Sequence, residues 1–388
     1  MATYEKKFKS IETNLLHAGK PSPNIEGAVV NPIFQSANYL MGEESEYGDV
    51  RYIRLNNSPN HQVLHHRLAA IESAETALVA ASGMAAITAV LLTFLESGDH
   101  LLAHKSLYGG TQTFLSQDAP RFGCEHTPID AAAPAGWEAA LRPRTRLIYV
   151  ESISNPLIEV GDLRAVVRFA KEHELLSVID NTFATPINFR PLEIGFDLVV
   201  HSATKYLNGH SDIVAGVVAG SSARVDAVRH VLNHLGGSLD PHACFLLERG
   251  LKTLALRVER QNTSALRLAC FLAGRREVRR VNYPGLESDP GYRFAHELFS
   301  GCGGMLSFYT RTPEQAATFL HSVRIPTHAA SLGGLETLVV RPSRSSHLGL
   351  APEERQKLGL TDDLVRVSVG IESIDELVAD FEQALART

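Results

Sequence analysis

Short apolar runs alternate with segments of helical spacing through the first two thirds of the chain. The runs predict buried strands at 76–81, 101–103, 147–150, 176–179, 198–200 and 214–218. Between them, apolar residues recur at helical spacing, for example over 61–74, 85–95 and from Asp162. Strands that alternate with helices favour an α/β fold, in which helices cover a mostly parallel sheet.

From Pro241 the pattern changes to a long stretch with helical spacing. Predicted strands follow at 306–309, 338–340 and 365–369, and a closing helix is predicted over 374–385. We therefore expect a large α/β domain over 50–245 and a smaller α/β domain over 246–388. Residues 1–49 are mostly polar, with scattered prolines and short apolar groups, so they cannot form a core of their own. They predict an extended arm that contacts a neighbouring subunit.

Composition and charge exclude several classes of protein. With 388 residues, 44% hydrophobic and 21% charged, the chain has the make-up of a folded globular protein. The net charge of −6, without a basic block, gives no reason to expect a nucleic-acid or membrane partner. No apolar run has signal-peptide character or approaches the roughly 20 residues that span a bilayer. We expect a cytoplasmic protein.

Metal and disulfide chemistry are not indicated. The four cysteines are far apart and form no CxxC pair; they are Cys124, Cys244, Cys270 and Cys302. His61 and His65 have the spacing of ligands on one helix face. They lack an acidic or cysteine partner nearby. We therefore expect no metal site and four reduced cysteines.

The strongest chemical signal is the stretch His201 to Asp212, HSATKYLNGHSD, with Lys205 at its centre. It follows the apolar run 198–200, so the lysine is expected at a strand end, where open α/β sheets bind ligands. A lone lysine there could be a solvated loop cation. However, a second apolar run ends in Asp180, which predicts a carboxylate at the same sheet edge. Lysine and acid so placed predict pyridoxal phosphate: the lysine bonds the aldehyde, and the acid keeps the pyridine nitrogen protonated.

A phosphate cradle is predicted where a strand is followed by Ser82, Gly83 and Met84 and then by an apolar helix. Glycine lets the backbone approach closely, and the free amides of a helix start point at an anion. Ser-Gly also caps many ordinary helices, so this signal is weak by itself.

These motifs stand in an order that carries a family resemblance. They are HAGKPSPNIEGAVVNPIF, YIRLNN, ASGMAAI, SLYGGT, VIDNTFATP, HSATKYLNGHSD, RGLKTLALRVERQN, SLGGLETL and LVRVSVGIE. Over nearly its whole length the chain resembles the cysteine and methionine metabolism family of pyridoxal-phosphate enzymes. That family includes cystathionine γ-synthases, cystathionine and methionine lyases and O-acyl-homoserine sulfhydrylases. The resemblance implies pyridoxal-phosphate fold type I, similar to aspartate aminotransferase, with a large seven-stranded sheet and a homotetramer built from two active dimers.

The resemblance also implies cofactor-binding residues. Lys205 is the covalent attachment site and Asp180 the partner of the ring nitrogen, as the chemistry predicts. The phosphate is implied to lie against the loop of Ser82, Gly83 and Met84, with added hydroxyls from Ser202 and Thr204. Tyr52 and Arg54 of the neighbouring subunit are implied to reach the same phosphate; the alternative is an ordinary surface loop.

Further positions match residues around the substrate. Tyr108 matches the tyrosine that stacks on the cofactor ring and transfers protons near the leaving group; the alternative is a packed core tyrosine. Arg366 matches the arginine that binds the substrate α-carboxylate through a bidentate pair. Ser331 and Asn155 match residues around that carboxylate and the O3′ side of the cofactor.

The resemblance implies a carbon-sulfur lyase that performs γ-elimination on cystathionine or a smaller thioether such as methionine, giving a 2-oxo acid, ammonia and a thiol. A γ-replacement synthase, which joins a thiol to an activated homoserine, is the alternative. An aminotransferase would need the same lysine, aspartate and arginine, and a non-catalytic binding protein would not need them.

Three departures from the family pattern leave the substrate open. Ala330 stands where family members that handle cystathionine carry a glutamate. Gly110 stands where methionine γ-lyases carry a cysteine. An extra residue precedes Pro59 in YIRLNNSPN.

Overall fold

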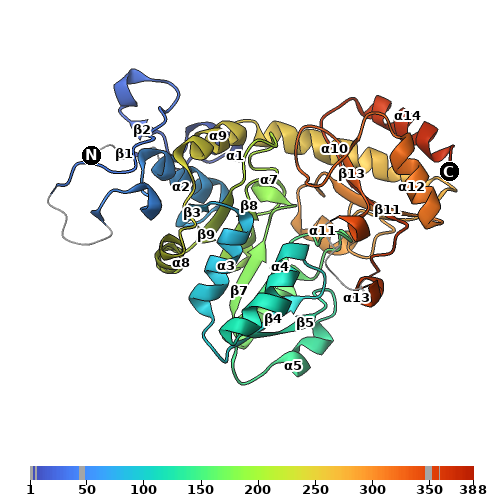
Figure 1. The fold of residues 1–388 in the computed structure, drawn as a ribbon, viewed down its shortest axis with the longest axis horizontal. Coiled ribbons are helices and arrows are strands. Elements are labelled where there is room, and N and C mark those ends of the chain that lie inside the picture. Colours follow the sequence, from blue (N-terminus) through green and yellow to red (C-terminus); the bar gives the residue numbers. More distant parts are fainter. Residues whose placement is uncertain (1–2, 5–6, 43–48, 346–351, 358) are drawn as a thin grey trace.

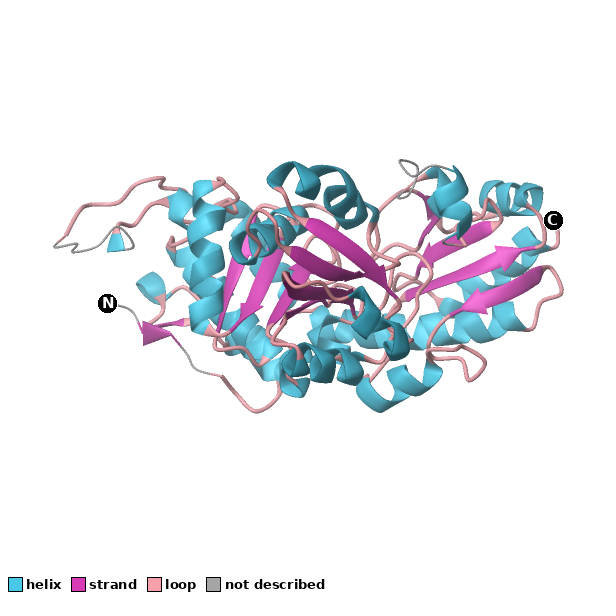
Figure 2. Cartoon of the chain, turned by 90° about the horizontal axis from the view of Figure 1, so that it is seen from below, coloured by secondary structure: helices cyan, strands magenta, loops and turns pink. Residues whose placement is uncertain are grey.

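Two sheets lie side by side and carry most of the fold, as the computed structural model shows (Figure 1, Figure 2). The structure describes residues 3–4, 7–42, 49–345, 352–357 and 359–388. The larger sheet has seven strands in the order β3-β9-β8-β7-β6-β4-β5. They are β3 (Thr76–Ala80), β4 (His100–His104), β5 (Glu125–Ile129), β6 (Thr145–Glu151), β7 (Leu176–Asp180), β8 (Leu198–Ser202) and β9 (Gly216–Gly220).

The larger sheet is mostly parallel, as the sequence predicts. Neighbouring strands from β5 to β8 run parallel, whereas β9 is antiparallel to both β8 and β3. Its helices are α2 (Pro59–Glu72), α3 (Gly83–Phe94), α4 (Gly109–Thr113), α5 (Trp137–Ala140), α6 (Leu163–Glu172), α7 (Thr185–Asn188), α8 (Ser222–His234) and α9 (Pro241–Leu251). Two apolar clusters fill the space between sheet and helices, and both contain side chains from the central strands.

The smaller sheet has five strands in the order β10-β11-β14-β13-β12. They are β10 (Val278–Asn282), β11 (Met305–Thr310), β12 (Thr327–His328), β13 (Leu338–Val340) and β14 (Leu364–Ser368). The helices of this part are α10 (Leu254–Ala273), α11 (Tyr292–Leu298), α12 (Pro313–Ser322), α13 (Pro352–Lys357) and α14 (Ile374–Leu385). Side chains of α10, α12 and α14 pack on this sheet in a third apolar cluster. Helix α10 runs from the larger part to the smaller (Figure 1).

The long helical stretch after Pro241 is two helices, because the chain leaves helical geometry at Thr253 (φ −112°, ψ 6°) between α9 and α10. The predicted domain boundary near residue 245 falls within α9 and stays a prediction. No helix in the described ranges is long and apolar enough to cross a membrane.

The amino-terminal arm is only partly extended. Residues Ile11–His17 form helix α1, with Ser10 as its N-cap, and Leu15 is buried where α1 packs on α2. Strands β1 (Thr3–Tyr4) and β2 (Pro21–Ser22) pair beside it. Farther along the arm, Val29, Leu40 and Met41 expose most of their side chains. The arm thus presents apolar side chains that the described residues leave exposed.

Candidate active site

Lys205 and Asp180 come from neighbouring strands of the larger sheet. Asp180 is the last residue of β7, and Lys205 lies in the turn that follows β8. The two strands are parallel, with Asp180 opposite Val200, so both polar segments leave the same edge of the sheet. The structure therefore brings the predicted pair to the carboxyl edge, where ligands bind in open α/β sheets.

Asp180 is a buried carboxylate with one oxygen fully engaged and the other nearly free. Its Oδ1 accepts hydrogen bonds from the backbone N–H (2.9 Å) and the hydroxyl (2.5 Å) of Thr182. Its Oδ2 has only a long contact, 3.5 Å, with the Tyr149 hydroxyl. Burial raises the pKa of Asp180, and the bonds from Thr182 oppose that rise. A protonated ring nitrogen donating to Oδ2 would supply the missing positive partner, so this residue fits pyridoxal phosphate.

Lys205 points across to the smaller α/β part. Its Nζ donates a hydrogen bond of 2.7 Å to Oγ of Ser331. Burial, and then the positive charge of Arg366, lower the pKa of Lys205 from 10.5 to about 8. The lowered pKa makes the neutral, nucleophilic amine accessible near physiological pH, as Schiff-base chemistry requires.

Arg366 projects from β14 and is held by residues of both parts. Its Nη1 donates to Oδ1 of Asn155 at 2.9 Å, and its Nη2 donates to the backbone carbonyl of Ser331 at 3.1 Å. Ser331 has a φ of 92°, an unfavourable conformation for a residue with a side chain. That conformation directs its hydroxyl to Lys205 while its carbonyl faces Arg366. The structure thus assembles Lys205, Ser331, Asn155 and Arg366 into one cluster.

Tyr108 begins the turn into α4 and exposes 42% of its surface. It is not a packed core tyrosine. A Cβ atom on Gly110 would lie 2.6 Å from Cε1 of Tyr108 and 3.1 Å from Sδ of Met84. The ring therefore occupies space that a side chain at position 110 would need, and any larger residue there must displace it.

Glu151 is a site residue that the sequence reasoning missed. It ends β6 directly opposite Asp180 in the ladder. Its two oxygens accept from the backbone N–H of Tyr108 (2.6 Å) and of Asn155 (3.1 Å). Burial and the charge of Asp180 raise its pKa. One buried carboxyl group therefore fixes the backbone of two predicted site residues. The signal was present, because Glu151 follows an apolar run just as Asp180 does.

The predicted phosphate loop begins helix α3. Ser82 is the N-cap and accepts from the backbone N–H of Ala85 at 3.0 Å. A Cβ on Gly83 would lie 2.8 Å from Cβ of Ser202, so only glycine allows this turn to approach the end of β8 so closely. The Thr204 hydroxyl is already engaged with the backbone of Ala215, at 3.0 and 3.2 Å. The helix start and Ser202 form a cradle that suits a phosphate.

Tyr52 and Arg54 do not join this cluster within the chain. Arg54 donates to the backbone carbonyl of Asn233 at the end of α8, and its guanidinium lies 5.8 Å from the Tyr52 ring centroid. Tyr52 is 39% exposed and its backbone N–H donates to Asn57. Neither of these interactions involves Lys205, and the role of Tyr52 and Arg54 at a neighbouring subunit's cofactor stays a prediction.

Comparison with known proteins supports the same chemistry. The family model described as "Cys/Met metabolism PLP-dependent enzyme" matches residues 12–386. The chain is 41% identical to L-methionine gamma-lyase of Pseudomonas putida, with 98% of each protein covered. It is 40% identical to cystathionine gamma-lyase of Bacillus subtilis, over 96% of this chain and 98% of that protein.

A solved structure extends the likeness to the fold. Cystathionine gamma-lyase from Lactobacillus plantarum, complexed with L-serine, superposes with a TM-score of 0.92 and 34% identity. The match covers 98% of this chain and 99% of that one. These findings confirm the predicted fold class and cofactor. The chain belongs to the family of pyridoxal-phosphate-dependent enzymes of cysteine and methionine metabolism.

Proposed function

We propose that this chain catalyses γ-elimination on a sulfur amino acid, cystathionine or a smaller thioether such as methionine, and releases a 2-oxo acid, ammonia and a thiol. The observation that carries the proposal is the convergence of Lys205 and Arg366 on Ser331. It supports the proposal because it brings an amine suited to proton transfer beside a guanidinium suited to bind a carboxylate. Relatives named as methionine and cystathionine gamma-lyases give independent support.

Arg366 orients the substrate. Its guanidinium would bind the α-carboxylate, and Asn155 and Ser331 already hold it in place. A charge-assisted pair of this kind fixes distance and direction together. The bond from Cα to its hydrogen is thereby held toward Lys205.

Lys205 moves the protons. When bound, pyridoxal phosphate supplies an electron-accepting ring, attached through this lysine and held at its ring nitrogen by Asp180. The amine of Lys205, bonded to Ser331 beside Arg366, would take the Cα proton of a substrate held by that arginine, acting as general base. It would then pass protons toward Cβ, which the departure of a group on Cγ requires.

Tyr108 would assist the departure of the sulfur. Its exposed ring lies beside the loop that carries Met84. In this proposal its phenol donates a proton to the departing thiolate. Glu151 does not touch the substrate; it positions Tyr108 and Asn155 through their backbone amides.

The complete site would contain two chains. Tyr52 and Arg54 lie apart from Lys205 within one subunit, and the arm exposes apolar side chains such as Leu40. We therefore propose an active dimer in which Tyr52 and Arg54 reach the partner's cofactor phosphate, and a homotetramer of two such dimers. A cytoplasmic location stays a prediction from the sequence.

Elimination and replacement are separated by their products. The purified enzyme is incubated with cystathionine, methionine, or an O-acyl-homoserine plus cysteine, and 2-oxo acid and thioether are both measured. We expect 2-oxo acid and ammonia in equal amounts from at least one thioether. Thioether formation without ammonia would instead establish the γ-replacement alternative, which the relatives reported above do not favour.

The role of Lys205 is tested by Lys205→Ala. Without the amine, turnover should fall below detection, while circular dichroism and unfolding remain close to the unmodified enzyme. Lys171→Ala, an exposed lysine at the end of α6, is the matched control and should keep full activity. Retained turnover in Lys205→Ala would refute the assignment.

A further inference from the structure

Glu72 and His201 form a buried pair of ionisable side chains that the proposed reaction does not use. Glu72 is the last residue of α2, and His201 lies in β8 just before Ser202. Nε2 of His201 lies 2.5 Å from Oε1 of Glu72, and each side chain exposes only 1% of its surface. We call these two residues the α2–β8 pair.

The α2–β8 pair differs from a buried histidine that serves packing. His61 uses one ring nitrogen in a bond to Ser58 and the other in a bond to the carbonyl of Leu239, and both partners are neutral. His201 instead bonds a carboxylate, and its Nδ1 has no partner among the described residues. Oε2 of Glu72 is unpartnered in the same way. Buried polar atoms without partners are costly, so packing does not explain the pair.

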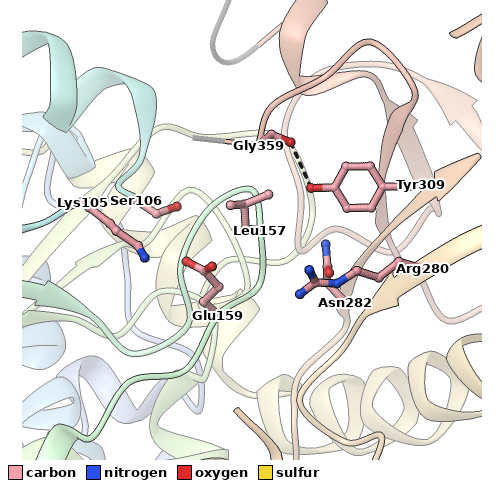
Figure 3. Close-up of a pocket in the computed structure, with 8 residues that line it drawn as sticks. All are labelled: Lys105, Ser106, Leu157, Glu159, Arg280, Asn282, Tyr309 and Gly359. Atoms are coloured by element: carbon pink, nitrogen blue, oxygen red, sulfur yellow. Dashed lines mark hydrogen bonds between the residues drawn. The ribbon is translucent and has the colours of Figure 1, made fainter. Parts of the chain in front are cut away.

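The position of Glu72 favours a protonated His201. The C-terminal end of a helix is the negative end of its dipole, so a carboxylate there is disfavoured and a cation is favoured. Figure 3 shows a carboxylate in a different setting, Glu159, flanked by Lys105 and Arg280 in a cavity of about 270 Å³. Burial raises the pKa of Glu159, and both cations oppose that rise. Glu72 is closed off from solvent, and the imidazole beside it is the group that can balance its charge.

His201 lies next to the backbone that holds Asp180. Asp180 stands opposite Val200 in the ladder of β7 and β8, so the His201 side chain points to the other face of the sheet. The backbone N–H of Ser202 donates to the Thr182 hydroxyl at 2.8 Å. That hydroxyl donates in turn to Oδ1 of Asp180 at 2.5 Å. The α2–β8 pair is therefore one peptide away from the hydrogen bonds that fix this carboxylate.

The charges around Asp180 oppose one another. Burial raises the pKa of Asp180, whereas the hydrogen bonds from Thr182 and the charge of His201 lower it. Glu151, opposite Asp180 on β6, is a second buried carboxyl group, and burial and the charge of Asp180 raise its pKa. The Tyr149 phenol, 3.5 Å from Oδ2, is neutral because burial raises its pKa. A positive charge on β8 would therefore favour the ionised form of Asp180.

We propose that the α2–β8 pair is a positioning ion pair, in which Glu72 holds a positively charged His201 that keeps Asp180 ionised as the acceptor for the protonated ring nitrogen of pyridoxal phosphate. The pair would act through Asp180, from the other face of the sheet. This role depends on the proposed assignment of Asp180 to the ring nitrogen, but not on which sulfur amino acid is the substrate.

The protonation of the ring nitrogen is measured by ¹⁵N NMR of the holoenzyme, with cofactor labelled at that nitrogen. Glu72→Gln and His201→Gln should each remove the positive charge, because a buried ionisable group that loses its partner takes its neutral form. We expect the pH midpoint of the nitrogen to fall by about one unit in both variants, a tenfold change in its protonation equilibrium. An unaltered nitrogen signal in either folded variant would overturn the proposal.

Glu248→Gln is the matched control, because it breaks another buried ion pair of α2, formed with Arg67 at 3.2 Å. It should lower the stability and leave the nitrogen signal unchanged. An equal change of the signal in this control would attribute the effect to lost stability and refute the proposal. If Glu72→Gln does not fold, His201→Gln decides by the same signal. Failure of both to fold would assign the pair to the fold and overturn its proposed role.

Asp180→Asn tests the assignment of the ring partner separately. Without the carboxylate, the nitrogen should lose its proton. Retained protonation in this variant would refute the assignment of Asp180, and the role of the α2–β8 pair with it. The nitrogen signal does not require turnover, so the absence of γ-elimination would leave this test intact.

Discussion

Two buried arginines, Arg67 and Arg366, show how differently this fold treats the same charge. Arg67 on α2 is fully buried, and its Nη1 lies 3.2 Å from Oε1 of Glu248 on α9. Arg366 on β14 is 4% exposed and bonds only neutral oxygens, from Asn155 and Ser331. In the ranges that the structure describes, no carboxylate forms an ion pair with Arg366.

The difference distinguishes an arginine that stabilises the fold from one that is available to bind a ligand carboxylate. Glu248 also accepts from Nδ2 of Asn31 at 3.0 Å, and Arg67 donates its Nε to the carbonyl of Ala18, so the charge of Arg67 is paired within the chain, although its Nη2 has no hydrogen-bond partner among the described residues. Burial lowers the pKa of Arg366 to about 10, with little compensation from nearby groups. A buried cation without a counter-ion is costly, and a bound carboxylate would remove that cost.

Arg257 shows that a missing carboxylate is not sufficient. It is 4% exposed and also lacks an acidic partner, and burial lowers its pKa to about 10. However, it donates to Thr253 Oγ1 and to the carbonyls of Tyr206, Leu207 and Gly250. The guanidinium N–H groups of Arg257 are therefore already used in hydrogen bonds within the chain. Arg366 makes only two such bonds, and this leaves donors for a ligand.

The largest expected effect is on stability, in Arg67→Met. Removing one member of a buried ion pair leaves Glu248 uncompensated, and this should lower the free energy of unfolding by about 3–5 kcal/mol. Denaturant unfolding measures the loss, and the activity of the folded enzyme should be unchanged. The double variant Arg67→Met with Glu248→Met is the control and should recover part of the stability. A large loss of activity at full stability would show that Arg67 serves the reaction and not the fold.

Arg366→Met should lower the activity and leave the stability nearly unchanged. Without the carboxylate receptor, kcat/KM for the preferred thioether should fall about 100-fold, mostly through KM, while unfolding changes little. Steady-state kinetics and unfolding are measured on the same preparation. Arg344→Met, at an exposed arginine paired with Asp362, should stay within about twofold of the unmodified enzyme. If Arg366→Met kept its KM, the receptor assignment would fail.

The sequence predicted the parts of the fold that burial dictates. The strands before Asp180 and Lys205 are largely apolar runs because both faces of the sheet are covered, and such runs can be recognised without a structure. Strand β10, VRRVN, escaped prediction because two of its residues are exposed arginines. Helix α1 was missed because its stability depends on packing against α2.

The site was predicted less completely, because its geometry depends on long-range contacts. The Asn155–Arg366 bond joins positions 211 residues apart, and only the closed fold brings them together. The left-handed φ of Ser331 cannot be inferred from a serine followed by Leu332, since the conformation is imposed by contacts with Lys205 and Arg366. The assigned roles remain predictions that the variants test.

Glu151→Gln disturbs the support of Arg366, through Asn155, without changing the charge of the arginine. Glutamine keeps one acceptor but turns an NH₂ group toward a backbone N–H, so either Tyr108 or Asn155 loses its anchor. We expect kcat to fall about tenfold and KM to rise, with circular dichroism unchanged. Glu172→Gln on the exposed end of α6 is the control. Loss of stability with unaltered kinetics would make Glu151 merely structural.

The smallest expected effect is a pH dependence that follows from the lowered pKa of Lys205. Its folded pKa of about 8 is below the ordinary 10.5, so between these values the unfolded chain binds more protons and stability of the apoenzyme rises with pH. Attachment of the cofactor aldehyde to the apoenzyme needs the neutral amine, and its rate should rise with a midpoint near pH 8. The absorption of the bound cofactor follows this rate.

Two variants test which neighbouring groups set the pH midpoint of cofactor attachment. Arg366→Met removes a positive neighbour and should move the midpoint to higher pH, because the charged amine is then less disfavoured. Ser331→Ala removes the acceptor of the ammonium hydrogen bond and should move it lower by about half a unit, as expected for one such bond. Opposite shifts in the two variants would show that Arg366 raises the reactivity of Lys205 as well as holding the substrate. If the midpoint did not change in Arg366→Met, the role of that arginine would be limited to binding the substrate.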